Sequence, residues 1–290
     1  MAAQTRSARL RQAIFRWRGL PILSFALMLG ILAMAIAGPL FAPHPANPGE
    51  LRDSLLPPAW CQGGDGRYLL GTDQFGRDIL SRIIYGARIS VTLSLICIFF
   101  GGTVGTLLGL FSGYFGGLVD TVIMRLTDIT LSLPMILVAI LLAAARGPTY
   151  ENVIIVVGLF LWPRYCRQIR GEVLAIREQE FVAAARVAGA APFRIVFKHF
   201  FPNITPTLLV LISLQVGYVI ILSATLSFLG AGVPPPTPDW GVMVSDGRAN
   251  IQTAWWVSIF PGLVILITVL SMNNIGDWLR DRLDPKLRQA

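Results

Sequence analysis

Few residues of this 290-residue chain could carry out chemistry themselves. It has two lysines, Lys198 and Lys286, and neither follows a glycine, which excludes a G-x-x-x-x-G-K-[ST] phosphate loop. Its two histidines, His44 and His199, cannot form an H-E-x-x-H zinc site, and no cysteine pair has metal-ligand spacing. The sequence therefore predicts neither ATP hydrolysis nor a metal or other cofactor in this chain.

One acidic residue, Asp128, is well placed to enter an apolar segment. A proton relay is one hypothesis, because intramembrane carboxylates often serve proton transfer. We favour a simpler interpretation, a local ion pair with Arg125 three residues earlier. A self-sufficient ion-coupled carrier would need more intramembrane ionisable groups or detectable repeat halves. Energy for any active transport must therefore arrive through contact with another protein.

The segment best suited to such contact is 172–202, a polar and basic stretch between two apolar segments of membrane length. It contains E-F-V-A-A-A-R-V-A-G at Glu180–Gly189, whose alanines favour a helix. Gly189 stands where a left-handed glycine would end that helix, and Pro192 suits the first turn of another. The sequence predicts two short helices that meet at a turn of small residues.

Two other interpretations of this segment stay open. Phe193, Val196, Phe197 and Phe200 recur at helical spacing. Their apolar face would also suit an interfacial helix that rests on anionic lipid headgroups. A helix-turn-helix that reads DNA is a weaker alternative, because apolar segments of membrane length abut the unit on both sides.

The spacing A-A-x-x-x-G, followed after nine residues by x-x-x-P, resembles the EAA loop of ABC-importer permeases. The matching region contains Glu180, Ala183, Ala184, Ala185, Gly189 and Pro202. The chain departs from the family pattern at Ala183, where the family has Glu, and at His199 and Phe201, where it has Ile and Leu. The resemblance implies that the loop's short helix seats in a cleft of an ATPase subunit. Gly189 would supply the turn, the alanines would permit close approach, and Glu180 would pair with a basic group.

Three further motifs extend this resemblance over nearly the whole chain. They are G-T-D-Q-F-G-R-D-I-L-S-R at 71–82, P-P-T-P-D-W-G at 235–241 and L-R-D-R-L-D-P-K at 279–286. Together they are similar to the C-type permease of dipeptide and oligopeptide importers. The resemblance implies a type I ABC-importer fold and half of a translocation pathway in the bacterial inner membrane. Nickel-chelate and glutathione importers use similar permeases, so the substrate stays open.

The same family architecture implies several partners. These are a homologous second permease subunit, two ABC ATPase subunits, an extracytoplasmic substrate-binding protein and membrane lipid. Nucleic acid is not among them, although the net charge of +8 would suggest it in a soluble chain. A membrane scaffold without transport would leave the EAA-like spacing unexplained.

A second candidate site lies in the outer loop. Its motif residues are Gly71, Thr72, Asp73, Gly76, Arg77 and Asp78. Thr72, Asp73 and Asp78 could each cap a short amphipathic helix. Its apolar stripe would contain Ile79, Leu80, Ile83 and Ile84, with Arg77 and Arg82 facing polar surroundings. This helix either lies in the interface, packs on the partner permease or borders an outer gate. Beyond it, Trp240, Trp255 and Trp256 suit an outer aromatic belt.

The elements that must position these residues are membrane helices. Hydrophobic residues make up 54% of the chain and charged residues 14%, whereas a soluble domain carries about 25% charged residues. Six segments are apolar over the length that a membrane helix needs: about 21–42, 89–111, 126–145, 150–168, 205–229 and 254–273. Arg164 and Arg167 would snorkel toward the interface at the end of the fourth segment. Glycines 101, 102, 105 and 109 indicate closely packed helices.

The distribution of arginine and lysine predicts the orientation. Seven of the 24 basic residues fall on 43–88, 146–149 and 230–253, which leaves 24 − 7 = 17 on the other side. Because basic residues favour the cytoplasm, both termini and the EAA-like loop are expected there. The first apolar run is longer than a signal peptide needs, so we expect a retained span. The predicted parts are a tail at 1–20, a first span at 21–42, an outer loop at 43–87, a five-helix transmembrane domain at 88–277 and a tail at 278–290.

Overall fold

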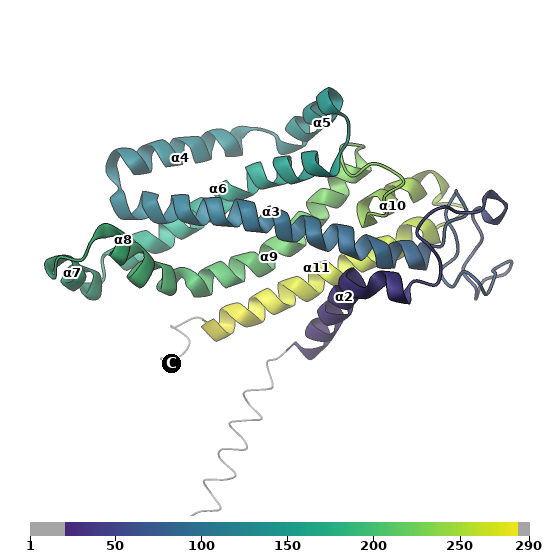
Figure 1. Cartoon of the computed structure of the whole chain (residues 1–290), viewed down its shortest axis with the longest axis horizontal. Coiled ribbons are helices and arrows are strands. Elements are labelled where there is room, and N and C mark those ends of the chain that lie inside the picture. Colours follow the sequence, from purple (N-terminus) through teal and green to yellow (C-terminus); the bar gives the residue numbers. More distant parts are fainter. Residues whose placement is uncertain (1–20, 284–290) are drawn as a thin grey trace, which may run out of the picture.

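The computed structural model describes residues 21–283, and the regular secondary structure of this part is helical. The predicted tail at 1–20 lies outside the described residues, as does the end of the 279–286 motif with Lys286. Four long helices run side by side along the molecule (Figure 1). They are α3 (Ile79–Phe115), α6 (Tyr150–Arg177), α9 (Phe201–Phe228) and α11 (Trp256–Leu283). The all-α membrane fold expected from composition is confirmed.

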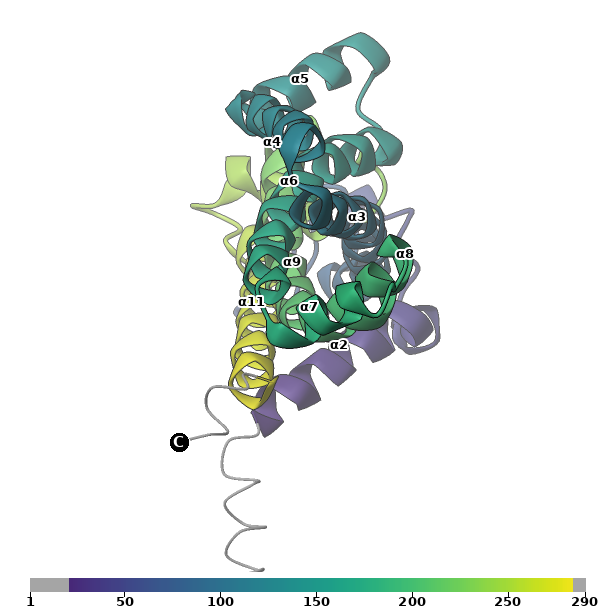
Figure 2. The same ribbon diagram turned by 90° about the vertical axis from the view of Figure 1, so that its left-hand side faces the viewer.

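The remaining helices cover the sides and ends of this bundle. In both views α2 (Ile22–Phe41) lies on one side, and α4 (Gly117–Ser132) with α5 (Met135–Arg146) lies on the opposite side (Figures 1 and 2). The short α7 (Glu180–Val187) and α8 (Pro192–Ile195) form one end of the bundle. At the other end lie α10 (Trp240–Gly247), two 3₁₀ turns (Leu51–Asp53 and Arg248–Asn250) and the loop from 42 to 78.

The predicted count of six spans is only partly matched. Within residues 21–283, four helical stretches are long and apolar enough to cross a membrane: Ile22–Phe41, Ile79–Phe115, Pro192–Phe228 and Trp256–Leu283. The bent pair α4 and α5 would make a fifth. The helix α6 is not among them, because Arg164, Arg167 and Arg170 interrupt its apolar character.

The third predicted span, 126–145, is not one straight helix. The chain bends by 74° between α4 and α5. Leu133 is extended at the break (φ −77°, ψ 132°), and Pro134 precedes the first residue of α5. A residue before proline is disfavoured in the α conformation, because the proline ring clashes with its backbone. The signal for the break was therefore in the sequence, but length and hydropathy alone do not detect it.

The prediction of two short helices in the polar loop is wrong for the second one. Pro192 does begin a helix, but that helix continues as one apolar stretch to Phe228. Five residues, Val196–Phe200, form a π-helix, and the Phe201 N–H donates to the Val196 carbonyl. Pro202 follows directly; it has no N–H, and its ring would clash with the carbonyl four residues back in a regular α-helix. The wider π turn accommodates this proline within a continuous helix.

The most extensive helix contact joins α3 to α6 along a row of glycines. Gly101, Gly105, Gly109 and Gly113 recur every four residues on the face of α3 that meets α6. A Cβ atom at Gly101 would lie 2.8 Å from the Leu161 Cβ, and one at Gly113 would lie 2.7 Å from a Val173 methyl group. The close packing expected from these glycines is confirmed.

Candidate functional site

The short helix α7 ends as its sequence predicts. Gly189 has a φ of +74°, a left-handed conformation that glycine adopts without strain. Its N–H donates to the Arg186 carbonyl at 3.0 Å, and the Ala190 N–H donates to the Ala185 carbonyl at 3.1 Å. These two bonds form a Schellman motif, which satisfies the last carbonyls of the helix and turns the chain sharply.

One buried side chain anchors α7 on the bundle. Val182 is fully buried in an apolar cluster, which also includes Val173 of α6, Ile195 of α8 and Phe200. The opposite face is open: Ala183 and Ala184 are exposed, and Val187 is 90% exposed. The helix therefore presents small and apolar groups at one end of the molecule, on a fixed base.

The structure gathers most residues of the EAA-like motif at this tip. Glu180, the alanines from Ala183 to Ala185 and Gly189 all belong to α7 and its terminal turn (Figure 2). The Glu180 side chain is exposed and forms no ion pair or hydrogen bond within residues 21–283, so its carboxylate is free for a partner. Pro202 does not join them, because it lies ten residues along the continuous helix that starts at Pro192.

The outer-loop motif forms a hydrogen-bonded turn rather than a separate helix. Gly71 and Gly76 have φ values of +81° and +70°, and a Cβ at Gly76 would collide with the Glu50 carbonyl oxygen. Asp78 caps the first turn of α3 and accepts hydrogen bonds from the N–H and the hydroxyl of Ser81. The short amphipathic helix expected before the second span is therefore the first turns of α3 itself.

Thr72 and Asp73 fix this turn from inside. The buried Thr72 hydroxyl donates to the Asp53 carbonyl and accepts from the Leu56 N–H. Its own carbonyl accepts from the Trp256 ring N–H at 3.2 Å, which ties the loop to α11. Asp73 accepts from the backbone N–H groups of Phe75 and Arg77. The motif thus holds the outer loop against the ends of two helices.

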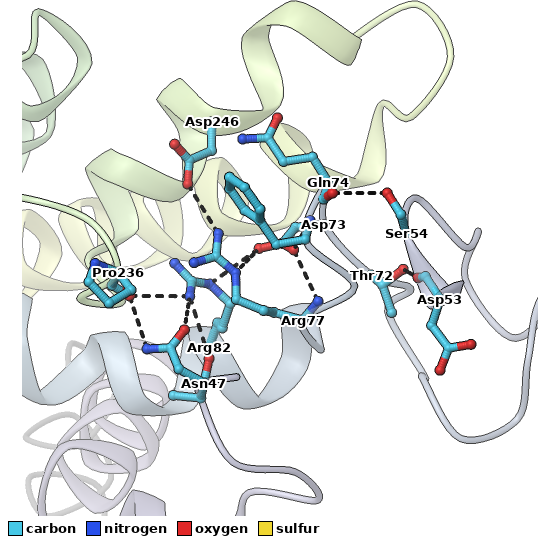
Figure 3. A network of polar contacts seen from close by, with 12 residues as sticks. Asn47, Asp53, Ser54, Thr72, Asp73, Gln74, Arg77, Arg82, Pro236 and Asp246 are labelled. Atoms are coloured by element: carbon cyan, nitrogen blue, oxygen red, sulfur yellow. Dashed lines mark hydrogen bonds and ion pairs between the residues drawn. The ribbon is translucent and has the colours of Figure 1, made fainter. Parts of the chain in front are cut away.

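Two buried arginines extend this turn into a charged network (Figure 3). Arg77 pairs with Asp73 at 2.6 Å and, more loosely, with Asp246 of α10 at 3.5 Å. Burial raises the pKa of Asp246, and the charge of Arg77 opposes that rise. Arg82 donates to Asn47 at 3.0 Å and lies 3.6 Å from Asp73. The expectation that Arg77 and Arg82 face polar surroundings is confirmed.

The aromatic belt predicted at this end is wrong for two of its three members. Trp240 is 1% exposed, and its ring N–H donates to the Ile83 carbonyl of α3 at 3.0 Å. Trp256 is buried as well, whereas Trp255 is 41% exposed. Tryptophan is amphipathic, so it suits a water–lipid interface as well as a buried site where its ring N–H is hydrogen-bonded. Residue type alone therefore could not show which of the two positions each tryptophan occupies.

Ion pairs between α4 and α6 differ from the prediction for Asp128. Its carboxylate pairs with Arg167 of α6 at 2.6 Å rather than with Arg125 on its own helix. A second pair, between Asp120 of α4 and Arg170 of α6, was not predicted. Both pairs join helices that are far apart in sequence, so a search for local i, i+3 partners misses them.

Comparison with known proteins identifies the relatives of this chain. Residues 105–289 match the family model described as "Binding-protein-dependent transport system inner membrane component". The chain is 52% identical over 261 residues to the "Dipeptide transport system permease protein DppC" of Escherichia coli K12, covering 89% of this chain and 86% of that protein. It is 44% identical over 265 residues to the "Di/tripeptide transport system permease protein DppC" of Pseudomonas aeruginosa UCBPP-PA14, with coverages of 91% and 87%.

A solved structure supports the fold. The MetNI methionine ABC transporter, in an inward-facing form, contains a chain that superposes with a TM-score of 0.57 at 17% sequence identity. The match covers 71% of this chain and 98% of that chain. At this identity the likeness concerns the architecture of the helices.

Proposed function

Because this chain belongs to the family of binding-protein-dependent transport system inner membrane components, we propose that it forms half of the translocation pathway of an ATP-driven importer of dipeptides and other short peptides. The peptide substrate is supported by two relatives named for dipeptide or di/tripeptide transport, at 52% and 44% identity over most of both chains. Nickel chelates and glutathione are less favoured, since neither of these relatives is named for them.

The observation that carries this function is the exposed tip of α7. Energy conversion in an importer needs a rigid surface where an ATPase can push on the membrane helices. The tip offers such a surface, because Val182 and its apolar cluster join α7 to α6 and to the start of α9. Its small side chains would permit close approach, and the unpaired Glu180 would meet a basic group of the ATPase.

The complete importer in this proposal contains four kinds of subunit. Permeases of ABC importers work with ATPase subunits and a second permease, and a substrate-binding protein would deliver the peptide from outside. We place the α7 tip and both chain termini in the cytoplasm and the outer-loop motif outside, in the inner membrane of a bacterium. The motif turn and its arginine network would then hold the outer loop beside α10.

Reconstituted transport tests the proposal directly. The chain would be purified with its partner permease, ATPases and binding protein and placed in proteoliposomes. We expect uptake of labelled dialanine that requires both ATP and the binding protein. Uptake of a nickel chelate or of glutathione without dialanine uptake would exclude the peptide assignment. Uptake by this chain alone, driven by an ion gradient, would exclude the importer assignment.

A further inference from the structure

Three arginines follow each other at three-residue spacing on α6, and two of them are neutralised. Arg170 forms two bonds to Asp120 of α4, at 2.5 and 2.6 Å. Arg167 pairs with Asp128 of α4 at 2.6 Å. Arg164 has no carboxylate within ion-pair distance among residues 21–283. It therefore brings an uncompensated positive charge to this part of the bundle.

A contact with Tyr218 holds the Arg164 side chain in place and uses few of its hydrogen-bond donors. Its side chain is exposed, and one Nη atom donates to the Tyr218 hydroxyl of α9 at 3.0 Å. The guanidinium also stacks over the Tyr218 ring, with 4.1 Å between its carbon and the ring centroid. Because a guanidinium has five N–H donors, this contact leaves most of them available to a ligand.

The position of Arg164 is deep along the helix rather than at its end. It lies 164 − 150 = 14 residues after the first residue of α6, which corresponds to about 21 Å along the axis. Its chain neighbours Trp162 and Tyr165 pack on Gly105 of the apolar helix α3, which lies ten residues before the last residue of that helix. The stack on Tyr218 gives the Arg164 guanidinium a protein partner on α9 along this part of the helix. A lone cation at this depth is costly against lipid, so it faces water, substrate or protein.

We propose that Arg164, positioned by Tyr218, faces the translocation pathway and binds the C-terminal carboxylate of the transported peptide. This inference rests on the proposed importer function and adds a substrate contact to it. A guanidinium and a carboxylate form two parallel hydrogen bonds, which combine charge with a fixed geometry. Every linear peptide with a free C-terminus carries that carboxylate whatever its side chains are. One arginine would thus bind all such peptides, whatever their amino-acid sequence.

The test uses the complete importer in proteoliposomes with peptide-loaded binding protein. We expect Arg164→Gln to lower dialanine uptake per ATP hydrolysed by about tenfold, since a hydrogen-bonded charge pair is lost. Stimulation of ATP hydrolysis by the binding protein should persist, because the α7 tip is untouched. Arg164→Lys should retain more uptake than Arg164→Gln. Arg125→Gln is the matched control and should behave as wild type, because the exposed Arg125 side chain of α4 forms no ion pair or hydrogen bond within residues 21–283.

Three results would overturn the inference. Unchanged uptake per ATP in Arg164→Gln would show that the carboxylate is not bound there. Loss of the second permease from the purified Arg164→Gln complex would assign Arg164 to the contact between subunits instead. A wild-type importer that fails to transport dialanine would refute the proposed function, and this inference with it. A transporting wild type with an unaffected variant would refute only the role of Arg164.

Discussion

At the scale of single residues, Asp239 shows how one carboxylate can fasten three helices. It is 1% exposed and precedes the first residue of α10. Its oxygens accept hydrogen bonds from the backbone N–H groups of Gly241 and Val242 and from the hydroxyls of Ser90 on α3 and Ser227 on α9. Burial raises the pKa of Asp239 above the ordinary 3.8, and these hydrogen bonds counteract part of the rise. The side chain thus acts as a helix cap and a cross-link together.

Two substitutions of Asp239 should separate the effect of its hydrogen bonds from the effect of its negative charge. Asp239→Ala removes the cap and leaves two buried hydroxyls without their acceptor, so we expect a loss of about 1–3 kcal/mol in stability. Asp239→Asn keeps an acceptor of the same shape and should be milder. Thermal unfolding of the purified complex measures both. Equal melting temperatures for Asp239→Ala and wild type would contradict the cross-linking role.

The raised pKa also predicts a pH effect with a defined sign. A carboxyl with a higher pKa in the folded state binds its proton more tightly there than when unfolded. Stability contributed by Asp239 should therefore rise as the pH falls through the raised pKa of the folded state toward the ordinary 3.8 of the unfolded chain. The melting temperature of wild type relative to Asp239→Asn should increase as the pH is lowered from neutrality to the ordinary value of 3.8. A constant difference over that range would show that Asp239 does not titrate there.

At the scale of helices, the glycine row of α3 determines how closely two helices approach. Helix association in membranes depends on packing, and small residues let backbones come close. A Cβ at Gly105 would collide with the Trp162 carbonyl and would lie 2.7 Å from the Tyr165 Cβ. These are rigid neighbours, so one added methyl group must push α3 and α6 apart.

Gly105→Ala should therefore destabilise the bundle, even though alanine favours helix formation in general. Gly158 provides a matched control on α6, because a Cβ there would meet nothing within 4 Å. We expect Gly105→Ala to lower the melting temperature and the yield of purified complex, while Gly158→Ala leaves both unchanged or slightly higher. Similar effects of the two substitutions would show that the row does not set the helix distance.

The turn at Gly189 can be tested apart from general strain. Valine in a left-handed position is strained by about 1–2 kcal/mol. Gly147, at the opposite end of the molecule, is a suitable control. Its φ is +80° and that of Gly189 is +74°, and a Cβ added at either glycine would meet no atom within 4 Å. Gly189→Val should reduce co-purification of the ATPases and uptake at normal membrane abundance, with Gly189→Ala milder. Gly147→Val carries the same strain but should retain the ATPases. Full ATPase binding and uptake in Gly189→Val would reject the docking role of α7.

At the scale of the whole molecule, the α7 tip and the outer loop lie at opposite ends of the bundle (Figure 1). A membrane between them must therefore separate the two, whichever way the chain is inserted. The excess of basic residues on the α7 side predicts that this side is cytoplasmic. Orientation is thus a single binary question for the whole chain.

Labelling of introduced cysteines answers that question. Gly66 is exposed and has no atom within 4 Å of an added Cβ, and Gln179 before α7 is exposed as well. In a chain whose native Cys61, Cys97 and Cys166 are replaced, Gly66→Cys should react with an impermeant thiol reagent in intact cells. Gln179→Cys should react only after the cells are opened. The reverse pattern would place the docking surface outside and exclude ATPase contact there.

The sequence predicted the fold class and the turn of α7 because both depend on local signals. Apolar length indicates membrane helices, and the glycine at 189 marks a helix end whatever surrounds it. The sequence did not predict the partner of Asp128 or the burial of Trp240. Each depends on which helices meet, and that is set by long-range packing such as the contact of α4 with α6. The bend at Pro134 has a local cause that the sequence contains. It was nevertheless missed, because the mean hydropathy of a long segment does not register a single proline.

The continuity of α3 has a mechanical consequence. With 37 residues it is a single rod of about 55 Å, well beyond the thickness of the hydrocarbon layer of about 30 Å. One end begins in the Asp78 turn beside the arginine network, and Leu110 near the other end lies in the cluster that anchors α7. A tilt of about 5° would move one end of a rod this long by about 5 Å relative to the other. The molecule therefore contains one continuous helix that joins its two surfaces, and the glycine row is where this helix packs closely on α6.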